Sequence, residues 1–262
     1  MLSLSVKNIS KTFPDGTEAL KGINFDVKAG EGVVLLGHNG SGKSTLFRCI
    51  SQFEKPTDGQ IYFNDQEATK LSKRKLRPLR KRIGMVFQHF HLIPNLSVHQ
   101  NVLFGALGQT NFSMQTFAPF ASKELRLEAM ECLDRVGLSH LAKRRADQLS
   151  GGQQQRVAIA RMLMQKPEIV LADEPIASLD PKAGREVMEL LWSITRERNL
   201  TIIAILHQMD IAMEFGERII ALKKGDKVID APVDEINRQQ LEDLYEHDPT
   251  ISDEEISKVV NS

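Results

Sequence analysis

The sequence predicts an α/β fold, and two short apolar runs carry that prediction. Residues 33–36 are typical of a strand buried on both faces, and a glycine-rich loop and a helix from about Lys43 to Gln52 follow them. Residues 169–172 form a second run of this kind, which ends in carboxylates and precedes a helical pattern over 182–198. A buried strand followed by a loop and a helix is the repeating unit of such folds.

Further elements are predicted from periodicity and turn residues. Leu2, Leu4 and Val6 alternate with polar residues as in a half-buried strand, and 23–27 alternate in the same way. The other expected elements are helices over 123–137 and about 151–165, a strand over 201–206, and a hairpin of 219–222 with 227–229. The acidic tail after Asp230 is expected to be a solvated extension.

The composition is that of an ordinary globular chain. Of 262 residues, 41% are hydrophobic and 26% charged, which is enough for one large domain with a subdomain. The 34 basic and 34 acidic residues balance to a net charge of +0, so no overall field favours nucleic acid or an anionic membrane. We expect no signal peptide, no transmembrane span and reduced thiols at Cys49 and Cys132.

Two stretches have unusual charge. Residues 73–82 hold seven basic side chains in ten, which is typical of a solvated face, although a nucleic-acid patch is an alternative. Residues 83–122 contain no charged residue apart from histidine, and six of the twelve phenylalanines lie there. This second stretch is interpreted equally well as a buried subdomain core with a loop or as an uncharged docking surface.

The glycine-rich loop fits a phosphate-binding pattern. The residues that match G-x-x-x-x-G-K-[ST] are Gly37, His38, Asn39, Gly40, Ser41, Gly42, Lys43 and Ser44, and Thr45 follows them. Glycines let the backbone N–H groups approach phosphate oxygens, and the helix that begins at Lys43 adds its positive dipole end. Lys43 is expected to contact the β- and γ-phosphates of ATP, and the Ser44 hydroxyl to ligate Mg²⁺.

Two carboxylates follow the strand predicted at 169–172. Asp173 suits Mg²⁺, and Glu174 is placed to polarise an attacking water. Taken alone, an Asp-Glu pair after a strand is more typical of loop solubility and capping. With a phosphate loop upstream, the catalytic interpretation is favoured.

A second anion site is predicted where small residues open the helix at about 151. Ser150, Gly151, Gly152 and Gln153 follow Leu149 and lie at that helix N-terminus. Two phosphate-binding helix starts in one chain are unusual for a simple kinase.

These motifs together resemble the ATPase of an ABC transporter. The phosphate loop, the LSGGQ run, the Asp173-Glu174 pair, Ser178-Leu179-Asp180 and His207 occur in that family's order, and the resemblance covers about residues 2–230. It implies that Gln88 is the Q-loop glutamine, which contacts Mg²⁺ and the water and couples to a membrane subunit. It also implies that Asp180 is the D-loop aspartate, that His207 contacts the γ-phosphate, and that Phe13 stacks on adenine.

The resemblance also implies an architecture. We expect a P-loop NTPase core over 1–230, with an N-terminal antiparallel β subdomain and an inserted α-helical subdomain over about 89–165, and an acidic extension over 231–262. We predict a head-to-tail symmetric homodimer, in which ATP would lie between the phosphate loop of one copy and Ser150–Gln153 of the other.

Several stretches resemble the phosphonate importer ATPases more closely, and phosphite importers share them. They include Leu206-His207-Gln208 around the switch histidine, Ala177-Ser178-Leu179-Asp180, and the insertion near 108–122. This resemblance implies a peripheral protein at the cytoplasmic face of the inner membrane, with permease subunits and, indirectly, a periplasmic solute-binding protein as partners and without nucleic acid. An importer ATPase for another solute such as an amino acid, or a soluble nucleic-acid-associated ATPase, is the alternative.

Overall fold

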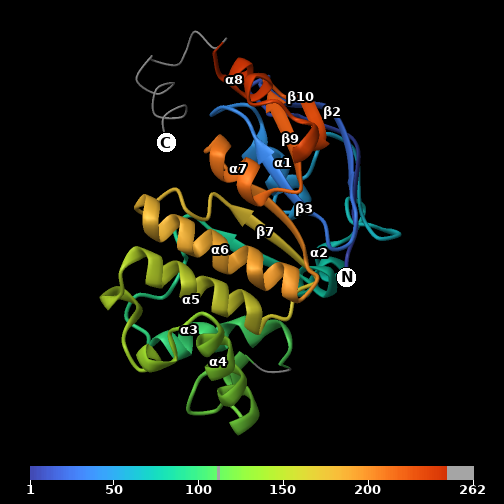
Figure 1. Cartoon of the computed structure of the whole chain (residues 1–262). Helices are drawn as coiled ribbons and strands as arrows, with labels where there is room; N and C mark the ends of the chain where they lie inside the picture. The colour runs from blue at the N-terminus through green and yellow to red at the C-terminus, as the bar shows by residue number, and fades with distance from the viewer. Residues whose placement is uncertain (111–112, 247–262) are drawn as a thin grey trace. The chain divides into compact units, whose positions relative to one another are not determined.

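A computed structural model describes residues 1–110 and 113–246, which form two compact units (Figure 1). The first unit contains residues 1–76 and the chain from 199 onward, and the second contains residues 77–198. The acidic residues 253–255 lie outside the described part of the chain. No helix among the described residues has the length and apolar character needed to cross a bilayer.

The first unit opens with an antiparallel sheet of order β2-β1-β4-β5. Its strands are β1 (Leu4–Thr12), β2 (Glu18–Val27), β4 (Asp58–Phe63) and β5 (Gln66–Glu67). Leu4 and Val6 are buried and their neighbours are not, as the alternation predicts for a sheet with one apolar face. The predicted N-terminal antiparallel β subdomain is therefore confirmed.

A second set of strands in this unit is centred on β3 (Gly32–Leu36). β3 pairs in parallel with β8 (Thr201–Ile205) and with β9 (Arg218–Lys223), and β10 (Asp226–Pro232) pairs antiparallel with β9. Every residue of β3 and β8 is buried, as expected for strands covered on both faces. The helices of this unit are α1 (Lys43–Ile50), α7 (Met209–Phe215) and α8 (Arg238–Glu246).

The chain after Asp230 differs from the solvated extension that we expected. Ile236 and Leu241 are buried, and Arg238 of α8 donates a hydrogen bond of 2.8 Å to Asp210 of α7. The prediction rested on the acidic composition of the tail and did not take account of Ile236 and Leu241. These two apolar residues pack against the unit at the beginning of α8 and just before it. The expectation fails for the described part of the tail.

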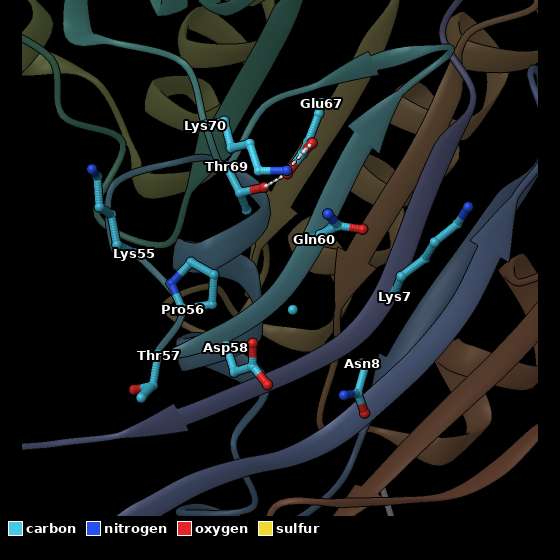
Figure 2. Close-up of a pocket in the computed structure, with 11 residues that line it drawn as sticks. Lys7, Asn8, Lys55, Pro56, Thr57, Asp58, Gln60, Glu67, Thr69 and Lys70 are labelled. Atoms are coloured by element: carbon cyan, nitrogen blue, oxygen red, sulfur yellow. Dashed lines mark hydrogen bonds and ion pairs between the residues drawn. The ribbon is translucent and has the colours of Figure 1, made fainter.

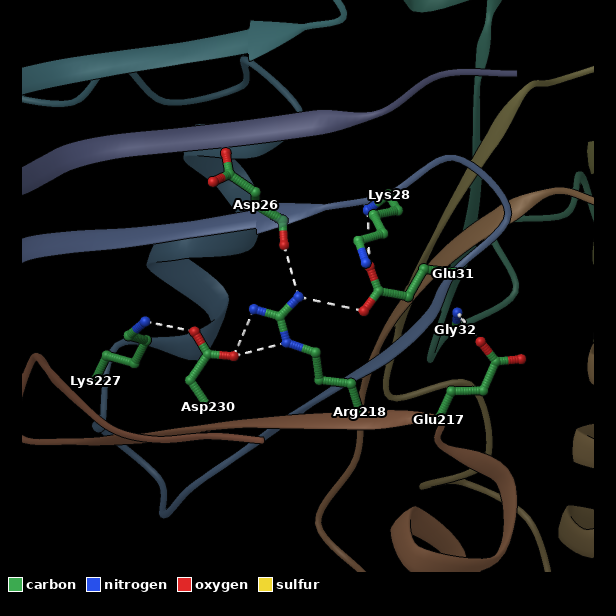
Figure 3. Close-up of polar contacts among 8 residues, drawn as sticks. All are labelled: Asp26, Lys28, Glu31, Gly32, Glu217, Arg218, Lys227 and Asp230. Carbon is green, nitrogen blue, oxygen red and sulfur yellow. Dashed lines mark hydrogen bonds and ion pairs between the residues drawn. The ribbon is translucent and has the colours of Figure 1, made fainter. Parts of the chain in front are cut away.

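Arg218, at the start of β9, is the centre of a largely buried polar cluster (Figure 3). Its guanidinium contacts Asp230 at 2.6 Å and Glu31 at 3.2 Å, and it donates to the carbonyl oxygen of Asp26 at 2.7 Å. The side chains of Arg218, Asp230 and Glu31 are each about one-fifth exposed or less. The cluster connects β2, the β2–β3 turn, β9 and β10. Its β9 pairs with β3, the strand that leads into the phosphate loop.

An Arg218→Met variant is expected to lower the free energy of unfolding by about 2–4 kcal/mol, because two largely buried carboxylates lose their cation. Urea unfolding of the full chain measures the change. Arg238→Met is the matched control, since its ion pairs are far more exposed and its loss is expected to cost about 1 kcal/mol or less. Equal effects of the two substitutions would contradict this account of the cluster.

The second unit contains a parallel strand pair and a group of helices. β6 (Ile83–Phe87) pairs with β7 (Ile169–Asp173). The helix α5 (Gly151–Met164) packs against α3 (Val98–Leu103), α4 (Lys123–Arg135) and α6 (Pro181–Glu197), as Figure 1 shows. The inserted α-helical subdomain is confirmed.

The two stretches of unusual charge have distinct structures. The basic run forms α2 (Lys73–Lys81), whose Leu76 and Leu79 are buried while most of its cations are exposed, in agreement with a solvated face. The uncharged stretch contributes Val98, Val102 and Leu103 to the core of the second unit. It also leaves large apolar side chains exposed, namely Ile93, Leu107, Met114, Phe117 and Phe120.

Candidate nucleotide site

The phosphate loop connects β3 to α1 and is shaped by glycines that no other residue could replace without strain. Gly37 has φ 142°, and a Cβ there would lie 2.2 Å from the carbonyl oxygen of Leu222. Gly42 has φ 107° and caps α1 without a side-chain hydrogen bond to its first turn. The first N–H groups of α1 are therefore without a side-chain cap, as an anion-binding helix start requires.

Two polar groups inside this loop fit a phosphate ligand. Lys43 is only 4% exposed, and its Nζ donates to the carbonyl oxygens of Gly37 at 2.5 Å and His38 at 2.8 Å. Ser41 Oγ is buried and has no hydrogen-bond partner among the described residues. A buried hydroxyl without a partner is costly, so a bound phosphate oxygen would supply a contact that the fold lacks.

A Gly37→Ala variant is expected to weaken ATP binding at least tenfold, because its methyl group would also lie 2.7 Å from Ser41 Oγ and push the loop out of shape. Calorimetry with ATP measures the effect. Gly40→Ala is the control, since a Cβ at Gly40 meets nothing within 4 Å and pays only the cost of φ 78°. A stronger loss in Gly40→Ala than in Gly37→Ala would contradict the steric argument.

His207 lies at the same edge of the first unit as the phosphate loop. In the parallel pair of β3 and β8, Leu35 is in register with Ile205, so Gly37 and His207 each follow two residues later. Phe13 lies in the turn between β1 and β2, where Lys11 Nζ is 5.1 Å from its ring centroid. The carbonyl oxygen of Ala19 on β2 closely approaches Gly42, which connects this β-hairpin to the loop.

In the second unit, Gln88, Asp173 and Glu174 lie at one edge of the parallel strand pair. Phe87 is in register with Asp173, so Gln88 and Glu174 both stand one residue beyond the paired ends. Asp173 and Glu174 are half-buried, and Glu174 has φ 47°, a left-handed conformation that is uncommon for a residue with a side chain. Such conformations concentrate at functional sites.

Gln155 of α5 supports this edge, and the sequence patterns did not identify it. Its Nε2 donates to the carbonyl oxygen of Pro175 at 2.6 Å and to that of Phe87 at 3.3 Å, so it bridges the ends of β6 and β7. The side chain is fully buried, and its Oε1 has no hydrogen-bond partner among the described residues. In the sequence Gln155 is the third of three consecutive glutamines, and nothing distinguishes it from Gln153 and Gln154.

Ser150–Gln153 and Asp180 act as helix caps in this structure. Ser150 and Gln153 form a capping box at the start of α5, and Asp180 Oδ1 accepts a hydrogen bond of 2.9 Å from the N–H of Ala183 at the start of α6. A Cβ at Gly151 would lie 3.1 Å from Leu179, so the two helix starts are close together.

Ser44 and Asp173, which are expected to contact Mg²⁺, each carry an oxygen donor of the kind that this ion prefers. The Ser44 hydroxyl is exposed and Asp173 is half-buried, and no group of three or more His, Cys, Asp or Glu side chains within the described ranges could hold a metal alone. Mg²⁺ in nucleotide sites usually takes one or two protein oxygens together with phosphate oxygens and water. Bound there, it would neutralise charge on the β- and γ-phosphates.

A groove of about 490 Å³ on the antiparallel sheet contains none of the predicted site residues (Figure 2). Its polar side chains come from β1, β4, β5 and the loops beside them, and they include both cations and carboxylates. Lys70 there is paired with Glu67 at 3.0 Å. The groove is therefore separate from the candidate nucleotide site and is not assigned a ligand.

Comparison with known proteins identifies the family. The model of the ABC transporter family matches residues 20–177. The phosphonates import ATP-binding protein PhnC 2 of Oceanobacillus iheyensis is 43% identical over 245 residues, which is 94% of this chain and 96% of that protein. The phosphonates import ATP-binding protein PhnC of Bdellovibrio bacteriovorus is 46% identical over 243 residues, which is 92% of this chain and 93% of that protein.

Solved structures agree with the sequence comparisons. The chain resembles the dimeric, post-hydrolysis ATP-binding cassette MJ0796 bound to ADP and Pi, with a TM-score of 0.77 and 39% identity, over 88% of this chain and 98% of that one. The fold predicted from the phosphate loop and the LSGGQ run is thus confirmed. The chain belongs to the ABC transporter family of ATP-binding proteins.

Proposed function

We propose that this chain is the ATP-hydrolysing subunit of an ABC importer for phosphonate or a related phosphorus oxyanion such as phosphite. The observation that carries the ATPase part is the pairing of strand ends in each unit. In the first unit the phosphate loop and His207 share one edge, and in the second Gln88 and Glu174 share another. The substrate class rests on the names of the relatives, which are phosphonates import ATP-binding proteins at 42–46% identity.

In this proposal each side chain has a defined task toward ATP. Lys43 exchanges its loop carbonyl contacts for the β- and γ-phosphates, and Ser44 and Asp173 would each supply an oxygen ligand to Mg²⁺. Glu174 accepts a proton from the attacking water as that water adds to the γ-phosphorus, and the bond from the γ-phosphorus to the leaving ADP oxygen breaks, so ADP and phosphate are formed. Gln88 and His207 position the water and the γ-phosphate, and Phe13 stacks on the adenine ring.

A second copy of the chain completes each site. In the head-to-tail homodimer, the capped helix start at Ser150–Gln153 faces the γ-phosphate held by the partner copy, and Asp180 lies beside it. Helix N-termini favour negative charge, which gives this helix start its role toward the triphosphate. Hydrolysis separates the γ-phosphate from ADP, so an intact triphosphate no longer joins the two copies and the dimer opens.

The uncharged stretch between β6 and α4 is proposed as the docking surface for the permease at the cytoplasmic face of the membrane. Its exposed apolar side chains include Met114, Phe117 and Phe120, and Phe117 packs edge-on against Phe104 at 5.4 Å between centroids. Aromatic side chains and methionine without nearby charge are typical of interface cores. Through this surface, movement of the helical subdomain would be transmitted to the permease.

The test is reconstitution with a permease and a solute-binding protein, which would first be sought among the genes that neighbour the gene for this chain. In proteoliposomes, ATPase activity is expected to rise severalfold when the binding protein carries a phosphonate or phosphite, and not with glutamine or phosphate. Stimulation by an amino acid instead would overturn the substrate class. Stimulation by DNA or RNA without any response to the permease would overturn the importer function.

A further inference from the structure

Arg161 of α5 contacts the loop that follows Gln88 and has no carboxylate partner among the described residues. Its Nη1 donates to the carbonyl oxygen of His91 at 2.5 Å and its Nη2 to that of Phe90 at 2.8 Å. These are the only hydrogen bonds of the guanidinium within residues 1–110 and 113–246. Burial lowers the pKa of Arg161 from its ordinary value, since no acidic side chain compensates the charge.

The loop that receives these bonds has an unfavourable backbone conformation. Phe90 has φ 54° and His91 has φ 47°, and both values lie in the left-handed region that residues with a Cβ seldom adopt. Two consecutive residues in this region persist only when the surrounding structure holds them. The planar guanidinium, with its two parallel N–H donors, is suited to fixing two adjacent carbonyl groups.

The same helix meets this loop at two further points. A Cβ at Gly151, the first residue of α5, would lie 3.8 Å from the ring of Phe90. Gln155 donates to the carbonyl oxygen of Phe87, immediately before Gln88. Hydrogen bonds from Gln155 and Arg161, together with the close approach of Gly151 to Phe90, thus connect α5 to the segment that carries Gln88.

We propose that Arg161 is a positioning residue that locks the loop 88–91 onto α5, so that Gln88 and the helix start at Ser150–Gln153 move as one body. The loop and the helix are rigidly coupled, because a loop that is held by residues near both ends of a helix cannot shift unless the helix moves with it. A nucleotide that draws in the helix start would then displace the loop with it. The effect on transport rests on the proposed function, whereas the lock itself does not.

Hydrogen exchange of the full chain, followed by mass spectrometry over residues 88–93, tests the lock directly. Arg161→Met is expected to raise the exchange rate of that segment at least tenfold. Arg161→Lys is expected to give an intermediate rate, since one ammonium cannot reproduce the two-donor fork. Arg156→Met is the matched control on the same helix, because Arg156 pairs with Glu186 instead, and it should leave the segment at the wild-type rate.

A second variant shows whether the lock restrains backbone strain. Glycine adopts left-handed φ without the cost of a Cβ, so His91→Gly in the Arg161→Met background is expected to recover part of the protection. ATP affinity should change less than twofold in all of these variants. In the reconstituted complex, Arg161→Met is expected to lower the kcat of permease-stimulated ATPase about tenfold with an unchanged KM for ATP.

The outcomes separate the lock from the proposed function. Wild-type exchange over 88–93 in both Arg161→Met and Arg161→Lys would overturn the lock, whatever the transport assay shows. Faster exchange in these variants with undiminished permease stimulation would overturn the coupling role of Arg161. A wild-type protein that no permease stimulates would instead refute the proposed function while leaving the exchange result in place.

Discussion

Glu174→Gln is expected to hydrolyse ATP about 10²- to 10⁴-fold more slowly than the wild type while binding ATP with similar affinity, the range that a general base contributes. Glu174 lies one residue beyond the end of β7, where its carboxylate can accept the proton of the attacking water. Glutamine keeps the size and hydrogen-bonding ability of the side chain but does not accept that proton. Single-turnover assays with radiolabelled ATP measure the hydrolysis step, and calorimetry measures the affinity.

Glu168→Gln is the matched control for this loss. Glu168 precedes the opposite end of β7 and pairs with Arg82, which lowers the pKa of that carboxyl to about 2. Removing the charge of Glu168 weakens a partly exposed ion pair with Arg82 and does not alter the strand end that carries Glu174, so this variant should hydrolyse ATP near the wild-type rate. Turnover near the wild-type rate in Glu174→Gln would refute the assignment of the base.

Lys43→Met is expected to weaken ATP binding about 10- to 100-fold, as the loss of one or more charge-assisted hydrogen bonds to phosphate predicts. The Lys43 ammonium is held inside the loop by two carbonyl oxygens, so it is already placed where the phosphates would lie. Methionine keeps the length of the side chain without the cation. Fluorescent-nucleotide titration in the presence of Mg²⁺ measures the affinity.

Lys55→Met is the control for a general loss of positive charge. Lys55 is exposed in the groove on the antiparallel sheet (Figure 2), and no residue of the phosphate loop lines that groove. It should leave ATP affinity within twofold of the wild type. An equal loss of affinity in both variants would show that Lys43 acts only through net charge.

Local patterns were sufficient for the strands and loops around the nucleotide site. The runs at 33–36 and 169–172 are apolar because both faces of β3 and β7 are covered, and burial on two faces leaves a signal in a single sequence. The phosphate loop was equally evident, since the positive φ at Gly37 and Gly42 restricts those positions to glycine. The expected positions of Gln88 and His207 depended on family resemblance, because one glutamine or histidine has no pattern of its own.

The residues that support the site were not predictable in this way. Gln155 and Arg161 act through backbone carbonyl groups of Phe87, Phe90, His91 and Pro175, which are distant in sequence. A carbonyl group carries no residue-type signal, so the partner of such a side chain is visible only in three dimensions. The same reason explains the packing of α8, because Leu241 is buried by tertiary contacts within an acidic segment.

We propose that each active site is shared between two copies of the chain, and mixing two inactive variants tests this sharing most directly. Lys43→Met lacks the phosphate contact but keeps its Ser150–Gln153 helix start. Ser150→Asp keeps the phosphate loop and can still cap α5, but it places a negative charge where the partner's γ-phosphate would approach. A heterodimer of the two contains one site in which both halves are intact.

The ATPase rate of the mixture distinguishes a shared site from a site that is complete within one chain. A shared site predicts activity well above the sum of the two variants measured separately, rising with protein concentration as heterodimers form. A site complete within one chain predicts a mixture that is no more active than that sum at any concentration, and this result would contradict the account.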